Sequence, residues 1–245
     1  MRAWHTAGHS TPLVVRTSGS TGEPKQVVLG PAAVLASAGA TLARLGGPGQ
    51  WLLALPVHHV AGLQVLVRSL LAGEDPVVLD EHPDFLTATA ALHGRRRYLS
   101  LVPTQLLRLL RDRDEVAALR SFDAVLLGGT AADPVLLARA REAGLPVVPT
   151  YGSSETCGGC VYDGRPLDGV AVKVDAGGRV HVAGPVLFDG YRDRPDLTAE
   201  VLVDGWLRSP DLGRLDDDGR LHVLGRVDDV VVSGGVNVAL PAVQT

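Results

Sequence analysis

The hydrophobic positions of the first 157 residues form short apolar runs that alternate with longer amphipathic stretches. A continuous run such as Trp51–Leu55 predicts a strand buried on both faces, because no polar position interrupts it. The predicted strands are Leu13–Val15, Val27–Leu29, Trp51–Leu55, Val77–Leu79, Tyr98–Val102, Asp123–Leu127 and Pro146–Pro149. The predicted helices are Pro31–Leu45, Val60–Leu71, Phe85–Leu92, Pro103–Arg111 and Pro134–Ala143. This alternation predicts an α/β fold with a mostly parallel sheet and helices on both faces.

The pattern changes near residue 158, where short apolar runs follow one another with glycine- and aspartate-rich turns between them. The predicted strands of this part are Val170–Val174, Arg179–Val182, Val186–Phe188, Leu221–Leu224 and Val230–Val232. We expect the acidic run Asp216–Asp218 to be a solvated turn. The sequence thus predicts an α/β subdomain over residues 1–157 and a smaller β-rich subdomain over residues 158–227.

Composition narrows the class of protein. A net charge of -4 argues against nucleic acid or an anionic membrane as the main partner. No apolar run reaches the roughly 20 residues of a membrane span, and the first ten residues lack the apolar core of a signal peptide, which predicts a cytoplasmic protein. The pair Cys157 and Cys160 has the spacing of a redox pair or of half a zinc site. Without a second such pair or a nearby histidine pair, we favour packing of small residues.

The first candidate site is the loop Thr17–Lys25, T-S-G-S-T-G-E-P-K, between two predicted strands. Its glycines allow tight turns and close approach to a ligand. Hydroxyls, backbone N–H groups and one ammonium can then converge on anionic oxygens, as a polyphosphate requires. The alternative is a surface turn. Lys25 favours the anion site, since the chain has 21 arginines and only two lysines.

Two further motifs follow predicted strands, and ligands of open α/β sheets bind at the carboxyl ends of strands. Gly128-Gly129-Thr130 would let a flat ring lie against bare backbone. The segment Tyr151–Thr156 offers an aromatic face, hydroxyls and the carboxylate of Glu155, which suits Mg²⁺. Alone, Glu155 would be read as an exposed carboxylate; beside a phosphate loop we read it as a metal ligand.

Two charged segments lie later in the chain. Ser209-Pro210-Asp211 and Gly225–Asp229 supply a carboxylate and an arginine that can bind the hydroxyls of a ribose or an attached phosphate. The basic run Arg95–Arg97 is expected to be a solvated helix end, with an anion site for a CoA phosphate as the alternative.

The order of these motifs resembles the adenylate-forming acyl-CoA synthetase superfamily. It runs from T-S-G-S-T-G-E-P-K through P-V-H-H-V-A-G, G-G-T, Y-G-S-S-E-T and D-G-W-L-R-S-P-D-L-G to G-R-V-D-D-V-V-V-S-G-G-V-N-V, and it covers nearly the whole chain from Thr17 onward. The resemblance implies that ATP, Mg²⁺ and CoA are used. Catalytic roles would fall to Lys25, His59 and Glu155, with Glu155 as the Mg²⁺ ligand, His59 at the acyl pocket and Asp228 as a hinge. Nucleotide contacts would come from Thr17, Ser18, Gly19, Ser20, Thr21, Gly22 and Lys25 at the phosphates, with Thr156 nearby, from Gly128, Gly129, Thr130, Tyr151 and Gly152 around adenine, and from Asp211 and Arg226 at the ribose.

Within the superfamily, P-V-H-H-V-A-G-L-Q and Y-G-S-S-E-T-C-G-G-C-V-Y-D-G resemble the o-succinylbenzoate–CoA ligases of menaquinone biosynthesis, in their short actinobacterial form. This implies a small carboxylic acid, o-succinylbenzoate, as substrate, and leaves a homodimer open. The rivals are another aryl- or acyl-CoA ligase of the superfamily, or a non-catalytic nucleotide-binding protein.

Three departures from the superfamily pattern stand out. Gln26 and Pro210 each replace a usual glycine, without removing a charged group. The family's small C-terminal lobe, which carries the adenylation lysine, is missing after Asn237, so residues 228–245 would be a hinge and the start of that lobe. We therefore expect the chain by itself to bind ATP but to form an adenylate slowly.

Overall fold

The computed structural model describes residues 11–17, 24–131, 133–233 and 236–239. Its largest sheet has seven strands in the order β4-β3-β5-β6-β7-β8-β9. The parallel part consists of β4 (Val77–Val78), β3 (Gln50–Leu53), β5 (Arg97–Leu101), β6 (Ala124–Leu127) and β7 (Val147–Ser153), and the strands β8 (Gly158–Tyr162) and β9 (Arg165–Pro166) extend it antiparallel. The sheet thus continues beyond residue 157, and the predicted division there stays a prediction.

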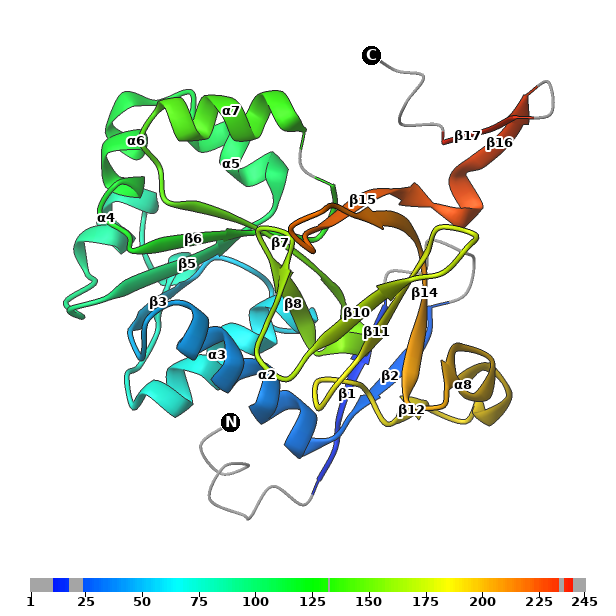
Figure 1. The fold of residues 1–245 in the computed structure, drawn as a ribbon. Helices are drawn as coiled ribbons and strands as arrows, with labels where there is room; N and C mark the ends of the chain where they lie inside the picture. Colours follow the sequence, from blue (N-terminus) through cyan, green and yellow to red (C-terminus); the bar gives the residue numbers. More distant parts are fainter. Residues whose placement is uncertain (1–10, 18–23, 132, 234–235, 240–245) are drawn as a thin grey trace.

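Helices cover both faces of this sheet (Figure 1). The helices α2 (Pro31–Arg44) and α3 (Val60–Ala72) pack on one face, and α4 (Phe85–Ala90), α5 (Pro103–Leu109), α6 (Arg113–Leu119) and α7 (Pro134–Glu142) pack on the other. Neighbouring strand residues point to opposite faces, so Trp51 joins the core under α2 and α3 while Leu52 joins the core under α4–α7. The predicted α/β architecture is confirmed. Strands that are apolar on both faces need helices to cover both faces of the sheet.

One helix of this layer was not predicted. The stretch expected as a single helix over 103–111 ends at Leu109, and α6 follows separately. Asp112 begins α6 by accepting hydrogen bonds from the backbone N–H groups of Asp114 and Glu115, at 2.8 and 3.1 Å. An aspartate before an acidic first turn is a helix-start signal that could have revealed α6.

The second part of the chain builds a five-stranded antiparallel sheet. It contains β10 (Ala171–Val174), β11 (Arg179–Ala183), β14 (Trp206–Leu215), β13 (Leu202–Val203) and β15 (Leu221–Arg226), the last paired to β14. A short helix, α8 (Pro195–Val201), precedes β13. Beyond η3 (Val227–Asp229), the strands β16 (Val230–Ser233) and β17 (Val236–Ala239) form a separate hairpin.

The predicted strand Val186–Phe188 is wrong. Both of its end residues are buried, yet the segment is an irregular loop, and the N–H of Phe188 donates to the carbonyl of Glu155 at 2.9 Å. The apolar residues there fill the core without a strand partner. This contact ties the loop to the segment that carries Glu155.

A third, small sheet brings distant parts of the chain together. The strands β1 (Leu13–Arg16) and β2 (Gln26–Leu29) form the predicted hairpin around the first candidate loop, and β12 (Gly190–Tyr191) pairs with β2. Residues near 190 therefore lie beside the base of that loop.

Two hairpins of the second part share one local design. The segments that begin at Asp175 and Asp216 both read D-x-x-G-R-[VL]-H and end at His181 and His222. In each, one carboxylate oxygen accepts the backbone N–H groups two and four residues on, and the other lies 3.0 or 2.7 Å from Nε2 of the histidine. The carboxylate of Asp216, expected to be merely solvated, thus fixes the turn between β14 and β15.

Among the residues that the structure describes, no helix is long and apolar enough to cross a membrane.

Candidate functional site

Thr17 closes the base of the first candidate loop. Its backbone N–H donates to the carbonyl of Lys25 at 2.9 Å, and its hydroxyl accepts the N–H of Lys25 at 3.1 Å. These bonds hold the two ends of the loop together where β1 and β2 stop pairing. The loop residues predicted to bind phosphates, Ser18, Gly19, Ser20, Thr21 and Gly22, lie outside the described residues.

The side chains of Lys25 and Glu155 meet at Tyr191. The ammonium of Lys25 lies 5.2 Å from the centre of the Tyr191 ring, and the phenol donates to Oε1 of Glu155 at 2.8 Å. Burial, then the negative charge of Glu155, raises the pKa of Tyr191, so the phenol stays a protonated donor. Lys25 and Glu155, which the sequence predicted as site residues and which are 130 positions apart, thus both contact Tyr191.

Thr156 supports the turn that presents Glu155. Its buried hydroxyl donates to the carbonyl of Gly158 at 2.7 Å and accepts the N–H of Ser153 at 2.8 Å. The 3₁₀ turn Ser154–Thr156 then ends at Cys157, whose φ of 51° is uncommon for a residue with a side chain. A contact of Thr156 with phosphate stays a prediction.

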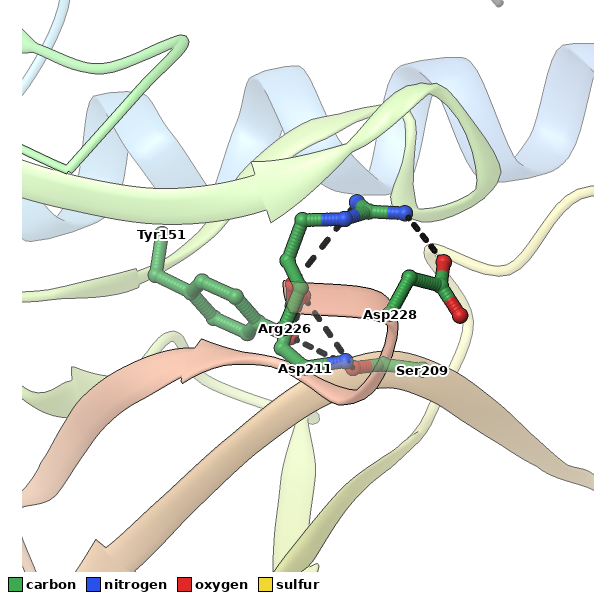
Figure 2. A network of polar contacts seen from close by, with 5 residues as sticks. All are labelled: Tyr151, Ser209, Asp211, Arg226 and Asp228. Atoms are coloured by element: carbon green, nitrogen blue, oxygen red, sulfur yellow. Dashed lines mark hydrogen bonds and ion pairs between the residues drawn. The ribbon is translucent and has the colours of Figure 1, made fainter. Parts of the chain in front are cut away.

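A second group of polar side chains surrounds Asp211 (Figure 2). The phenol of Tyr151 donates to Oδ2 of Asp211 at 2.8 Å, and the hydroxyl of Ser209 donates to the same oxygen at 3.1 Å. Arg226 stands directly opposite Asp211 in the β14–β15 ladder, with Nη1 3.9 Å from Oδ1. Its Nη2 lies 3.4 Å from Oδ2 of Asp228. The predicted ribose pair, Asp211 and Arg226, is therefore brought together.

The glycines after β6 and in β7 each have a packing reason. A Cβ on Gly128 would lie 2.5 Å from Oγ1 of Thr150, and one on Gly152 would collide with the carbonyl of Gly158. Gly129 has a φ of +93°, while Thr130 is exposed. The sequence placed these residues at a nucleotide; that role stays a prediction.

A family model described as "AMP-binding enzyme" matches residues 6–192. The chain belongs to this family. A probable 2-succinylbenzoate–CoA ligase of Mycobacterium tuberculosis is 51% identical over 235 residues, which cover 92% of this chain and 61% of that protein. The 2-succinylbenzoate–CoA ligase of Bacillus anthracis is 34% identical over 249 residues, covering 92% and 52%.

Solved structures give the same grouping. The o-succinylbenzoate coenzyme A synthetase of Bacillus subtilis, in complex with ATP and magnesium, has a TM-score of 0.79 and 30% identity, and the match covers 92% of this chain and 52% of that one. The complex of the same enzyme with its acyl-adenylate intermediate also has a TM-score of 0.79 and 30% identity, with 92% and 51% covered. The chain spans about half to three fifths of the length of these relatives.

His59 occupies the N-cap position of α3. Its side chain makes no capping hydrogen bond to the helix. His58 and His59 are both exposed, with ring centres 4.3 Å apart. Their exposure leaves either imidazole free to meet a ligand.

Arg68, on the same helix, was missed by the sequence reasoning. Its side chain is 3% exposed, and its guanidinium lies 4.9 Å from the Trp51 ring centre. Burial lowers its pKa, and within the described part of the chain no carboxylate pairs with it and its Nε has no hydrogen-bond partner. The available signal was one arginine inside the apolar run L-V-R-S-L-L-A.

The remaining candidates are the two cysteines and the basic run that begins at Arg95. Cys157 and Cys160 are buried free thiols in different core clusters, and burial raises the pKa of each to about 12. Such thiols are poor nucleophiles. Arg95 and Arg96 are exposed at the amino end of β5, opposite the carboxyl ends of the strands.

Proposed function

We propose that this chain is the nucleotide- and acid-binding part of an ATP-dependent acid–CoA ligase of the 2-succinylbenzoate type, acting in the cytoplasm in menaquinone biosynthesis. One observation carries the proposal beyond membership of the family. The continuous segment Tyr151–Thr156 contacts Asp211 at one end and, at the other, presents Glu155 to Tyr191, which Lys25 also contacts. A nucleotide needs this separation of a sugar end from a phosphate end.

The phosphate end fits Mg²⁺ and a polyphosphate. Glu155 is half-buried, and one of its oxygens has no hydrogen-bond partner among the described residues. A carboxylate oxygen is the ligand that Mg²⁺ prefers, and the bound ion would neutralise phosphate charge. Lys25 adds a positive charge from the position directly before β2, and Thr17 holds the loop base in place.

The sugar end fits a ribose. The Asp211 side chain is 18% exposed and that of Arg226 33%, so both can reach a ligand. Because Tyr151 and Ser209 hydrogen-bond to Oδ2, the other carboxylate oxygen is left to face Arg226, whose Nη1 lies 3.9 Å away. That oxygen can accept a sugar hydroxyl while Arg226 neutralises its charge.

The buried Arg68 favours a dicarboxylate as the acid substrate. Activation of 2-succinylbenzoate consumes one carboxylate and leaves the other in need of a cation. Arg68 is buried without a carboxylate partner among the described residues, and such a charge is costly unless a ligand pairs with it. His59, at the amino end of α3, would lie at the entrance to the acid-binding pocket, and Arg68 lies toward the carboxyl end of the same helix.

In the proposed reaction the substrate carboxylate attacks the α-phosphorus of ATP, pyrophosphate leaves, and the CoA thiol then displaces AMP. The residues of this chain would act by positioning and charge neutralisation, and none is required as a covalent nucleophile. The glycine-lined edge at Gly128 would receive the adenine ring.

The test is calorimetric binding of non-hydrolysable acyl-sulfamoyl adenosines that differ only in their acyl group. We expect the 2-succinylbenzoyl compound to bind at least about tenfold more tightly than the benzoyl compound, since only it carries the second carboxylate. Arg68→Met should remove that preference and leave benzoyl binding unchanged. Equal affinities for both compounds would favour another aryl-CoA ligase. Absence of binding by both compounds would support neither the 2-succinylbenzoate type nor another aryl-CoA ligase.

A further inference from the structure

We propose that Tyr191 is a positioning residue that keeps Glu155 and Lys25 apart and correctly oriented for a metal–polyphosphate ligand. This rests on the proposed function, because it concerns the same phosphate end. Tyr191 was not singled out by any sequence motif above. Its contacts in the folded chain assign the role.

The backbone of Tyr191 is fixed from two sides. It pairs with Val27 across the β12–β2 ladder, and its N–H donates to Oγ1 of Thr198 on α8 at 2.9 Å. The ring packs edge-on against Phe188, with centroids 5.0 Å apart and planes at 65°. The residue is 8% exposed. A side chain held in this way has one available direction for its hydroxyl.

The hydroxyl selects which oxygen of Glu155 is free. It donates to Oε1 at 2.8 Å, which leaves Oε2 with no hydrogen-bond partner in the described part of the chain. Partners of this kind orient carboxylate ligands for metals.

The ring separates two opposite charges. The Lys25 ammonium lies over the ring face at 5.2 Å, while the carboxylate of Glu155 is bonded at the hydroxyl. No ion pair joins Lys25 to Glu155 among the described residues. A direct pair would neutralise both groups, whereas the intervening ring stabilises the ammonium by a cation–π contact and leaves both charges for the ligand.

The test is the Tyr191→Phe variant of the full chain, which removes the hydroxyl and keeps the ring. ATP binding is titrated with MgCl₂ by calorimetry. We expect the Mg²⁺ concentration for half-maximal ATP binding to rise about tenfold, with ATP affinity at saturating Mg²⁺ within about twofold of wild type. In a Glu155→Gln background the same change should have no further effect, because its partner carboxylate is gone.

Tyr98→Phe is the matched control. Its phenol donates to the carbonyls of Leu45 and Gly47, just after the carboxyl end of α2, and not to Glu155, so its loss should lower stability without moving the Mg²⁺ midpoint. An unchanged midpoint in Tyr191→Phe, or an equal shift with and without Glu155, overturns the inference alone. Absence of ATP binding by the wild-type chain overturns the proposed function and the inference with it.

Discussion

Two tyrosines make the same kind of hydrogen bond to two carboxylates. Tyr151 donates to Asp211 and Tyr191 donates to Glu155, each at 2.8 Å. Burial raises the pKa of both phenols, so both act as permanent donors. Each hydrogen bond occupies one oxygen of its carboxylate and leaves the second for other partners. At the residue scale, the candidate site is thus a pair of oriented carboxylates, each with a cation nearby.

Sequence chemistry found the charged members of this arrangement and Tyr151, but it missed Tyr191. Lys25, Glu155, Asp211 and Arg226 were predicted because a charge in a glycine- or turn-rich segment suggests a ligand. Tyr191 is recognisable only once β12 pairs with β2, because it lies 166 positions after Lys25, the last residue of the loop. Such pairing is a tertiary event with no local signature.

The two neighbouring histidines allow a controlled prediction. We expect His59→Ala to weaken binding of the 2-succinylbenzoyl adenylate analogue about tenfold, the cost of one lost polar contact, and to change ATP affinity by less than about twofold. His58→Ala is the control, because His58 is equally exposed and sits 4.3 Å away. Calorimetry with both ligands measures this. Equal losses for ATP and the analogue would remove His59 from the acyl site.

At the scale of elements, the β14–β15 hairpin carries the sugar end of the site. Asp211 and Arg226 face each other at the end of the ladder away from the turn, and the turn is fixed by Asp216 and His222. The hairpin at Asp175 has the same turn without a candidate site residue on its strands.

This duplication supplies a matched pair of variants. We expect Asp216→Asn to weaken ATP binding by about three- to tenfold, because a loosened turn shifts Asp211 against Arg226. Asp175→Asn removes an equivalent turn contact and should leave ATP binding unchanged. Calorimetry measures the ATP affinity of both variants. Similar losses of affinity in the two would show that the turn at Asp216 does not position the site.

The same turn has a defined pH dependence. The hydrogen bond from His222, followed by that from the N–H of Arg220, lowers the pKa of Asp216 below its ordinary 3.8. A lowered carboxyl pKa stabilises the fold above that ordinary value, and the stabilisation is lost as the pH falls through the lower value of the folded state. Asp216→Asn should therefore flatten this part of the acid limb of an unfolding curve.

Element prediction succeeded where local signals mark the ends and failed where they do not. The helix over 31–44 begins at a proline and ends near two glycines, and its observed bounds lie within a residue of those predicted. The ten-residue strand β14 was not predicted, because Pro210 and Asp211 interrupt its apolar alternation. The prediction for Val186–Phe188 was wrong in the opposite way, because a strand was predicted where none forms. The buried apolar residues there have no strand to pair with.

At the scale of the whole molecule, three sheets meet around one segment. Tyr151–Thr156 leaves the seven-stranded sheet, contacts the five-stranded sheet through Asp211 and contacts the small sheet through Tyr191. The relatives that bear the ligase name are longer than this chain, which covers 61% of the Mycobacterium tuberculosis protein. The contacts between these three sheets make nucleotide binding the property to test first.

The most direct measurement is a calorimetric titration of the 245-residue chain with ATP, in MgCl₂ and in EDTA, for wild type and Glu155→Gln. Our account predicts one ATP per chain, with affinity at least about tenfold higher in Mg²⁺. Glu155→Gln should abolish most of that Mg²⁺ effect while leaving the thermal midpoint of the unliganded protein nearly unchanged. Absence of saturable ATP binding, or a Mg²⁺ effect that survives in Glu155→Gln, would contradict it.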